Sequence, residues 1–131
     1  MACRVPRAVC LAVIVLTMVT ACSETVTLPP TYPVKGMVVR ANGQPLTGGL
    51  VSLRCAEEPN LITEGVINGD GTFELVTVYK NVRQAGAIVG EHEVMVIPPM
   101  SIHQEAAPET LATKVTIEAK DLNELKLQMT R

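Results

Sequence analysis

The chain has 131 residues, with 11 Lys and Arg, 13 Asp and Glu, and a formal net charge of −2. This length suits one domain, and the charge balance excludes the clustered basic surface that nucleic-acid binding requires. The sequence has one Phe, two Tyr and no Trp. A core must therefore be built from Val, Ile, Leu and Met, and this β-branched enrichment favours strands.

The first 22 residues differ in composition from the rest, because they contain no Asp or Glu. Arg4 and Arg7 form a short basic segment, and residues 8–19 form a nearly unbroken apolar run. As a helix this run would span roughly 18 Å, which is short of the ~30 Å hydrocarbon core of a bilayer. The pattern predicts a secretory signal peptide. Without these 22 residues, nine basic and 13 acidic side chains remain, for a net charge of −4.

The apolar run ends in Val19-Thr20-Ala21-Cys22. This string resembles the lipobox of bacterial lipoproteins, in which a branched apolar residue and a small residue precede an obligatory Cys. The resemblance implies cleavage between Ala21 and Cys22, and transfer of a diacylglyceryl group to the Cys22 sulfur. Two or three acyl chains of the palmitate type, each buried CH₂ contributing ~0.8 kcal/mol, give stable retention in a membrane. An ordinary secretory signal or an uncleaved anchor are the alternatives.

The domain organisation follows from this motif. We predict a signal peptide over residues 1–21, an anchor Cys and extended tether over residues 22–32, and a folded domain over residues 33–131. Pro29-Pro30 favours polyproline geometry, so the tether could lift the domain up to ~30 Å from the bilayer. Ser23 follows the anchor Cys, where an Asp would mark retention in the inner membrane of a Gram-negative cell. The resemblance thus implies the cell envelope, with the outer membrane favoured.

Beyond residue 33, apolar and polar residues alternate in short runs between turn signals. Asn42-Gly43 and Asn68-Gly69-Asp70-Gly71 are the strongest turn signals. Residues 61–68 and 72–79 predict a hairpin. The seven predicted strands cover residues 34–41, 50–55, 61–68, 72–79, 91–97, 114–119 and 122–129. This spacing, without a convincing helix, predicts an all-β, seven-stranded Greek-key β-sandwich of the immunoglobulin-like or transthyretin-like type.

Three segments carry a family resemblance. They are the run from Pro33 to Ser52, with its Gly-Gln-Pro-Leu turn, then the string from Asp70 to Leu75, and last the string from Gly90 to Pro99. Together they resemble the carboxypeptidase regulatory-like and transthyretin-like domains of small bacterial lipoproteins. The resemblance covers roughly residues 33–99 and implies fold, not function. Phe73, the one large aromatic available, is expected to fill the centre between the sheets.

Candidates for catalysis are few. His92 is expected to be a half-exposed strand residue, and His103 lies in a polar loop with no partner in the sequence. The transthyretin fold also hosts hydroxyisourate hydrolase, which carries a carboxy-terminal Tyr-Arg-Gly-Ser, but this chain ends in Gln-Met-Thr-Arg. No nucleophile elbow or phosphate loop is present. We therefore predict no enzyme, no catalytic residue and no cofactor.

Oxygen and sulfur ligands for a metal are also sparse. Glu57-Glu58, Asn68 and Asp70 could suggest calcium, but turn chemistry is the favoured interpretation, since Ca²⁺ wants six to eight oxygens. Cys22 and Cys55 alone do not suffice for zinc. With Cys22 acylated, Cys55 has no intrachain disulfide partner. We expect Cys55 to be a small, partly buried hydrophobe, with a reactive thiol or an intermolecular bridge as the alternative.

The sequence therefore predicts a lipid-anchored cell-envelope β-sandwich with a structural or protein-interaction role. Its partners would be the membrane, through the lipid on Cys22, and an unidentified envelope protein, with no nucleic acid and no metal. The alternative is a surface-displayed module that binds carbohydrate or peptide. Sugar platforms need exposed aromatics, and Tyr32 and Tyr79 are the candidates outside the expected core.

Overall fold

A computed structural model describes residues 22–100 and 107–131, and within these ranges the chain is all β with no helix. The predicted signal peptide, including Ala21, and His103 lie outside the described residues. The strands are β1 (Thr31–Tyr32), β2 (Val34–Val39), β3 (Leu50–Cys55), β4 (Ile62–Val66), β5 (Thr72–Glu74), β6 (Val76–Tyr79), β7 (Val82–Ala85), β8 (Ala87–Ile88), β9 (Gly90–Ile97), β10 (Glu109–Thr110), β11 (Val115–Ile117) and β12 (Asn123–Gln128).

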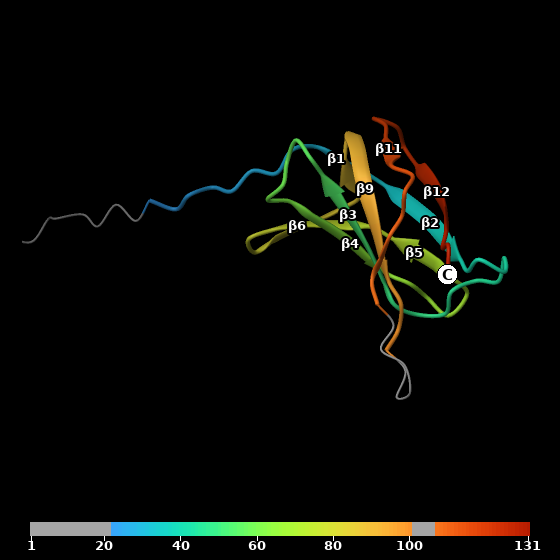
Figure 1. The fold of residues 1–131 in the computed structure, drawn as a ribbon. Helices are drawn as coiled ribbons and strands as arrows, with labels where there is room; N and C mark the ends of the chain where they lie inside the picture. Colours follow the sequence, from blue (N-terminus) through green and yellow to red (C-terminus); the bar gives the residue numbers. More distant parts are fainter. Residues whose placement is uncertain (1–21, 101–106) are drawn as a thin grey trace, which may run out of the picture.

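Two sheets enclose the core. The larger has the strand order β10-β9-β3-β4-β6-β7, with β11 also paired to β9, and the smaller has the order β12-β2-β5. β12 runs parallel to β2, from Asn123 opposite Val34 to Gln128 opposite Val39. A separate antiparallel pair, β1 with β8, lies at the end of the domain where the amino-terminal segment enters (Figure 1). The molecule is thus an open sandwich whose first strand belongs to neither main sheet.

Each of the seven ranges predicted as strands contains strand structure, but two predictions need correction. The short strands β1, β7, β8 and β10 lie in segments that we expected to be tether or loop. The run over residues 72–79 also divides, because β5 pairs with β2 while β6 pairs with β4. The predicted hairpin therefore forms only between β4 and β6. At Gly65 an added Cβ would lie 2.3 Å from the Glu74 carbonyl oxygen, so this glycine gives the chain room to change sheets.

The main core lies between the two sheets, and Phe73 is at its centre with 1% of its surface exposed, as predicted. Phe73 in β5 stands opposite Gly36 in β2. A Cβ on Gly36 would lie 2.4 Å from Phe73 Cζ, so the glycine makes room for the ring. Aliphatic side chains from both sheets complete this core, among them Val34, Val38, Leu53, Leu75, Val94, Val96, Ile117 and Leu127.

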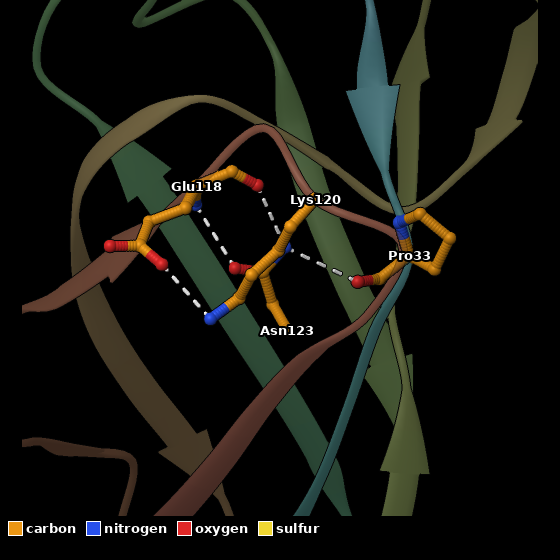
Figure 2. Close-up of polar contacts among 4 residues, drawn as sticks. All are labelled: Pro33, Glu118, Lys120 and Asn123. Atoms are coloured by element: carbon orange, nitrogen blue, oxygen red, sulfur yellow. Dashed lines mark hydrogen bonds and ion pairs between the residues drawn. The ribbon is translucent and has the colours of Figure 1, made fainter.

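A buried asparagine joins the starts of the two parallel strands in the smaller sheet. Asn123 is 2% exposed, and its side chain bonds both backbone groups of Glu118, accepting from the nitrogen and donating to the oxygen, each at 3.0 Å. Its backbone nitrogen donates to the Pro33 oxygen at 2.9 Å. Figure 2 shows the two side-chain bonds to Glu118, a third bond from the Asn123 amide nitrogen to the Pro33 oxygen at 3.4 Å, and the ion pair of Glu118 with Lys120. Asn123 thereby closes the turn after β11 and sets where β12 begins against β2.

Candidate functional site

Cys22, the residue on which the anchoring prediction depends, is the first residue that the structure describes. It is exposed and is a free cysteine. No regular secondary structure follows it until β1 begins at Thr31. The sulfur is therefore accessible on an extended segment, as attachment of a lipid would require. The other half of the predicted cleavage site, Ala21, lies outside the described residues.

The extended segment contacts the domain at a few points, mostly near its carboxy-terminal end. We call residues 24–32 the strap. Near its start, the Glu24 carboxylate lies 3.8 Å from Lys80 Nζ in the turn after β6. Near its end, Thr31 Oγ1 donates to the Ala85 oxygen at 2.7 Å, and β1 pairs with β8. The segment that we expected to act as a tether has no regular secondary structure over residues 22–30, and its carboxy-terminal part is already strand.

Gly86 leaves the space in which the end of the strap packs against the domain. Its φ is +95°, in the left-handed region that favours glycine, and an added Cβ would lie 2.2 Å from the Tyr32 oxygen. Its backbone nitrogen donates to the Leu75 oxygen at 2.8 Å. Any side chain at this position would push the strap away. The sequence offered Gly86 only as one glycine in a predicted loop, so the docking of the strap could not be inferred from it.

A small second core lies beneath the strap. Its buried members are Cys55, Leu61 and Ile88, and Leu28 of the strap packs against them together with Tyr79. Leu28 is half-buried. We call these five residues the strap cluster. The favoured interpretation of Cys55 as a small hydrophobe is consistent with its place in this cluster, where it is 3% exposed.

His92 was expected to be half-exposed, and this was wrong. It is 1% exposed, because the alternation of β9 places it on the inner face together with Val94 and Val96. Its Nε2 lies 3.0 Å from the Ile88 oxygen. In the β3–β9 pair, His92 stands directly opposite Cys55. The structure thus brings together two residues that the sequence analysis treated separately.

A charged groove lies on the outer face of the larger sheet, where β3 ends and β9 begins. Its volume is about 350 Å³, and its lining includes Arg54, Glu57, Glu91, Glu93 and Lys114. Arg54 stands opposite Glu93, and Lys114 Nζ lies 3.0 Å from a Glu91 oxygen. The hydrogen bond from Lys114 to Glu91 raises the pKa of the Lys114 ammonium. Because opposite charges lie side by side, the groove has no strong preference for an anion or a cation.

The residues weighed as calcium ligands are not gathered. Asp70 accepts hydrogen bonds from the hydroxyl and the backbone nitrogen of Thr72, and these bonds lower the pKa of its carboxyl. Asn68 bonds the same hydroxyl. Glu57 follows the carboxy-terminal end of β3. Asn68 lies at the opposite end of that strand, where its backbone oxygen accepts a hydrogen bond from the Gly48 nitrogen. Within residues 22–100 and 107–131, no three His, Cys, Asp or Glu side chains are grouped as a metal site.

Comparisons with known proteins identify no family. No protein-family profile and no curated protein match the chain. Among solved structures, the chain is similar to the major pilin subunit of Bacillus cereus, at 13% identity and a TM-score of 0.45. That likeness covers 78% of this chain and 30% of the pilin subunit, so the chain spans less than a third of it. Among the described residues, no helix is long and apolar enough to cross a membrane.

Proposed function

We propose that the protein is a lipid-anchored domain of the bacterial cell envelope, with a structural or protein-interaction role and no catalysis of its own. The observation that carries the proposal is the Val19-Thr20-Ala21-Cys22 motif, at the end of a basic and then apolar leader. Two features support it. Cys22 is exposed, and the segment after it is bound to the domain. An anchor attached to this segment would be coupled mechanically to the fold.

The strap would also set the height of the domain above the membrane. With Leu28 packed against the strap cluster, only residues 22–27 remain between the lipid and the first apolar docking contact. Six extended residues span at most about 20 Å. The end of the sandwich that holds the strap cluster would then face the bilayer. The opposite end, with the Asn42-Gly43 turn and Pro98-Pro99, would be presented to other envelope proteins.

We also propose the finer fold assignment, a Greek-key sandwich of the carboxypeptidase regulatory-like or transthyretin-like type. Support comes from the residues of the motif string. Gly36 makes room for Phe73, and Asp70 with Gly71 forms the turn into β5. The alternative function, a carbohydrate-binding module, has less support because Tyr32 and Tyr79 are both half-buried. Neither ring is an open platform.

Complementation of a deletion strain tests the proposed role. Wild type and a chain whose residues 1–22 are exchanged for the signal and anchor of another lipoprotein should both restore it. Cys22→Ser should not, because its product would lack the acyl chains. The proposal fails if Cys22→Ser restores the role as well as wild type does. The exchanged anchor is the control that separates a need for location from a need for these particular residues.

In a Gram-negative host, Ser23→Asp tests the choice of membrane. The sorting rule implied by the lipoprotein resemblance predicts that the wild type fractionates with the outer membrane and that the Ser23→Asp variant stays in the inner membrane. Ser23→Ala is the matched control and should behave as wild type. Equal distribution of wild type and Ser23→Asp would contradict the assignment.

A further inference from the structure

The outer face of the larger sheet carries a contiguous set of apolar side chains. Along β3, β4 and β9, every second residue points into the core, and the others point to the outer face. On that outer face, Leu50 stands opposite both Val66 and Ile97, and Ile62 stands opposite Val78 in the next strand. We call the apolar side chains of these rows the outer patch, which consists of Leu50, Ile62, Val66, Val76, Val78, Met95 and Ile97.

The outer patch is open to solvent. Val66 is 69% exposed and Ile62 is 55% exposed, while the other members are half-buried. The strap does not cover them, because its contacts lie at Lys80, at Ala85 and in the strap cluster. Single exposed apolar residues are ordinary in proteins, but a contiguous patch with polar residues at its rim marks an interaction site.

The outer face of the smaller sheet shows that the patch is not a general property of this fold. There Lys35 stands between Glu74 of β5 and Glu124 of β12, and its Nζ lies 2.9 Å from a Glu74 oxygen. Lys126 stands opposite Met37, the exposed apolar residue of that face. One sheet of the same domain therefore presents charged side chains to water, whereas the other presents aliphatic ones.

The charges next to the outer patch complement each other across a two-fold axis. Glu64 stands opposite Ser52, and Arg54 lies two residues further along the same strand as Ser52. Such diagonal neighbours are about 7–8 Å apart. Neither Glu64 nor Arg54 makes an ion pair within residues 22–100 and 107–131. In a symmetric pair of copies, a contact of Arg54 with Glu64 of the second copy implies the reverse contact as well. An axis between the two residues would therefore form two ion pairs at once.

The area of the face also suits a second copy. Strands lie about 4.8 Å apart and outward residues of one strand about 7 Å apart, so the sheet from β10 to β7 covers about 500 Å² over its outward rows. Two such faces bury about 1,000 Å² together, which is the size that a specific interface requires. Two sheets pack face to face at a separation of about 10 Å, as in the core of a sandwich.

We propose that a second copy of this chain docks on the outer patch, sheet against sheet, in a symmetric dimer with Arg54 of each copy against Glu64 of the other. The proposal rests on the interaction role proposed above and names the partner. Both copies would be anchored in one membrane, and this confinement raises their local concentration. An interface near the lower size limit is then sufficient for association.

Sedimentation equilibrium tests the dimer, with the full chain purified from membranes in a density-matched detergent. The ratio of protein to micelles is kept low, so that two chains rarely share a micelle by chance. Wild type should be a dimer that dissociates on dilution. Val66→Lys places a charge in the patch and should raise the Kd at least about tenfold. Leu122→Lys, at a 38% exposed apolar residue before β12, is the matched control and should associate as wild type does.

Charge reversal tests the contact between Arg54 and Glu64. Arg54→Glu and Glu64→Arg should each weaken association at least about tenfold, because like charges then meet twice across the axis. An equimolar mixture of the two variants should form a mixed dimer, because both contacts again join opposite charges. Sedimentation of fluorescently labelled Arg54→Glu with unlabelled Glu64→Arg measures this rescue. A change in the stability of either chain alone cannot produce it, and circular dichroism shows that each variant is folded.

Three results would overturn the proposal. A wild-type chain that sediments as a monomer at every concentration excludes the second copy as the occupant. Equal Kd values for Val66→Lys and Leu122→Lys exclude the outer patch as the interface. Failure of the two charge variants to associate on mixing excludes the arrangement about Arg54 and Glu64. Anchoring is measured separately, by the acyl mass on Cys22, so an acylated chain that stays monomeric contradicts the dimer and leaves the anchor in place.

Discussion

The main core and the strap cluster both bury apolar side chains, but they differ in how many they bury and in what covers them. The main core buries side chains from both sheets around Phe73, and Gly36 makes room for the ring. The strap cluster buries three residues and depends on Leu28 and Tyr79 for its cover. The first is self-sufficient, whereas the second is complete only when a segment near the amino terminus lies on it. The difference separates what holds the domain together from what couples it to its anchor.

The largest expected effect is in the main core. Phe73→Ala should lower the free energy of unfolding by ~3–5 kcal/mol, because it removes the one large aromatic from the centre of the sandwich. Urea unfolding followed by circular dichroism measures the change. Phe73→Leu, which keeps most of the volume, should cost less. A Phe73→Ala domain that melts within a few degrees of wild type would show that the core is not centred there.

The Gly36–Phe73 pair offers a sharper version of the same test. Gly36→Ala alone should destabilise the domain by ~1–3 kcal/mol, because its Cβ would overlap the Phe73 ring and also crowd the Leu125 backbone oxygen. Combined with Phe73→Leu, the alanine should cost less than it does alone, since the smaller side chain leaves space. A double-mutant cycle on the unfolding free energies measures this coupling. Strictly additive effects would contradict the close packing of the two residues.

Asn123 should give the next effect. Asn123→Ala leaves both backbone groups of Glu118 without their partner, and we expect a loss of ~1–3 kcal/mol in unfolding free energy. Asn60→Ala, at an exposed loop position, is the matched control and should change little. If both variants unfold at the same urea concentration, the turn before β12 does not depend on the buried amide.

Glu109 should give a smaller effect that depends on pH. Hydrogen bonds from the hydroxyl and backbone nitrogen of Thr130 lower the pKa of its carboxyl. A lowered folded-state pKa gives stability that is present above the unfolded value of ~4.3 and is lost as pH falls through the folded value. Glu109→Gln should therefore be less stable than wild type at neutral pH, and the gap should close in acid. A gap that stays constant with pH, or one equally large in exposed Glu124→Gln, would contradict this.

The smallest global effect should come from the strap. Leu28→Ala removes a half-buried side chain from the strap cluster, and we expect about 1 kcal/mol or less on the unfolding free energy. Amide hydrogen exchange should nevertheless speed up at β1 and β8 and stay unchanged at β3 and β9. Faster exchange throughout the sandwich would mean that the strap belongs to the main folding unit, and the contrast between the two cores would fail.

The two regions also differed in how far the sequence could predict them. Alternation and turn residues located the main strands, and the single Phe pointed to the core, because these signals are local. The strap cluster depends on contacts between residues far apart in the chain, such as Thr31 with Ala85. Pro29-Pro30 suggested a free tether, and no local pattern shows that it docks. His92 was misplaced because its polarity outweighed the alternation of β9, which put it inside.

The most direct test of the proposed anchoring is the intact mass of the protein extracted from membranes. We predict a chain that begins at Cys22, lacks residues 1–21, and carries the added mass of two or three acyl chains on that residue. Cys22→Ser should show neither the cleavage nor the acyl mass. A wild-type chain without acyl mass on Cys22, whether cleaved elsewhere or not at all, would contradict the lipid anchor and the membrane-facing orientation built on it.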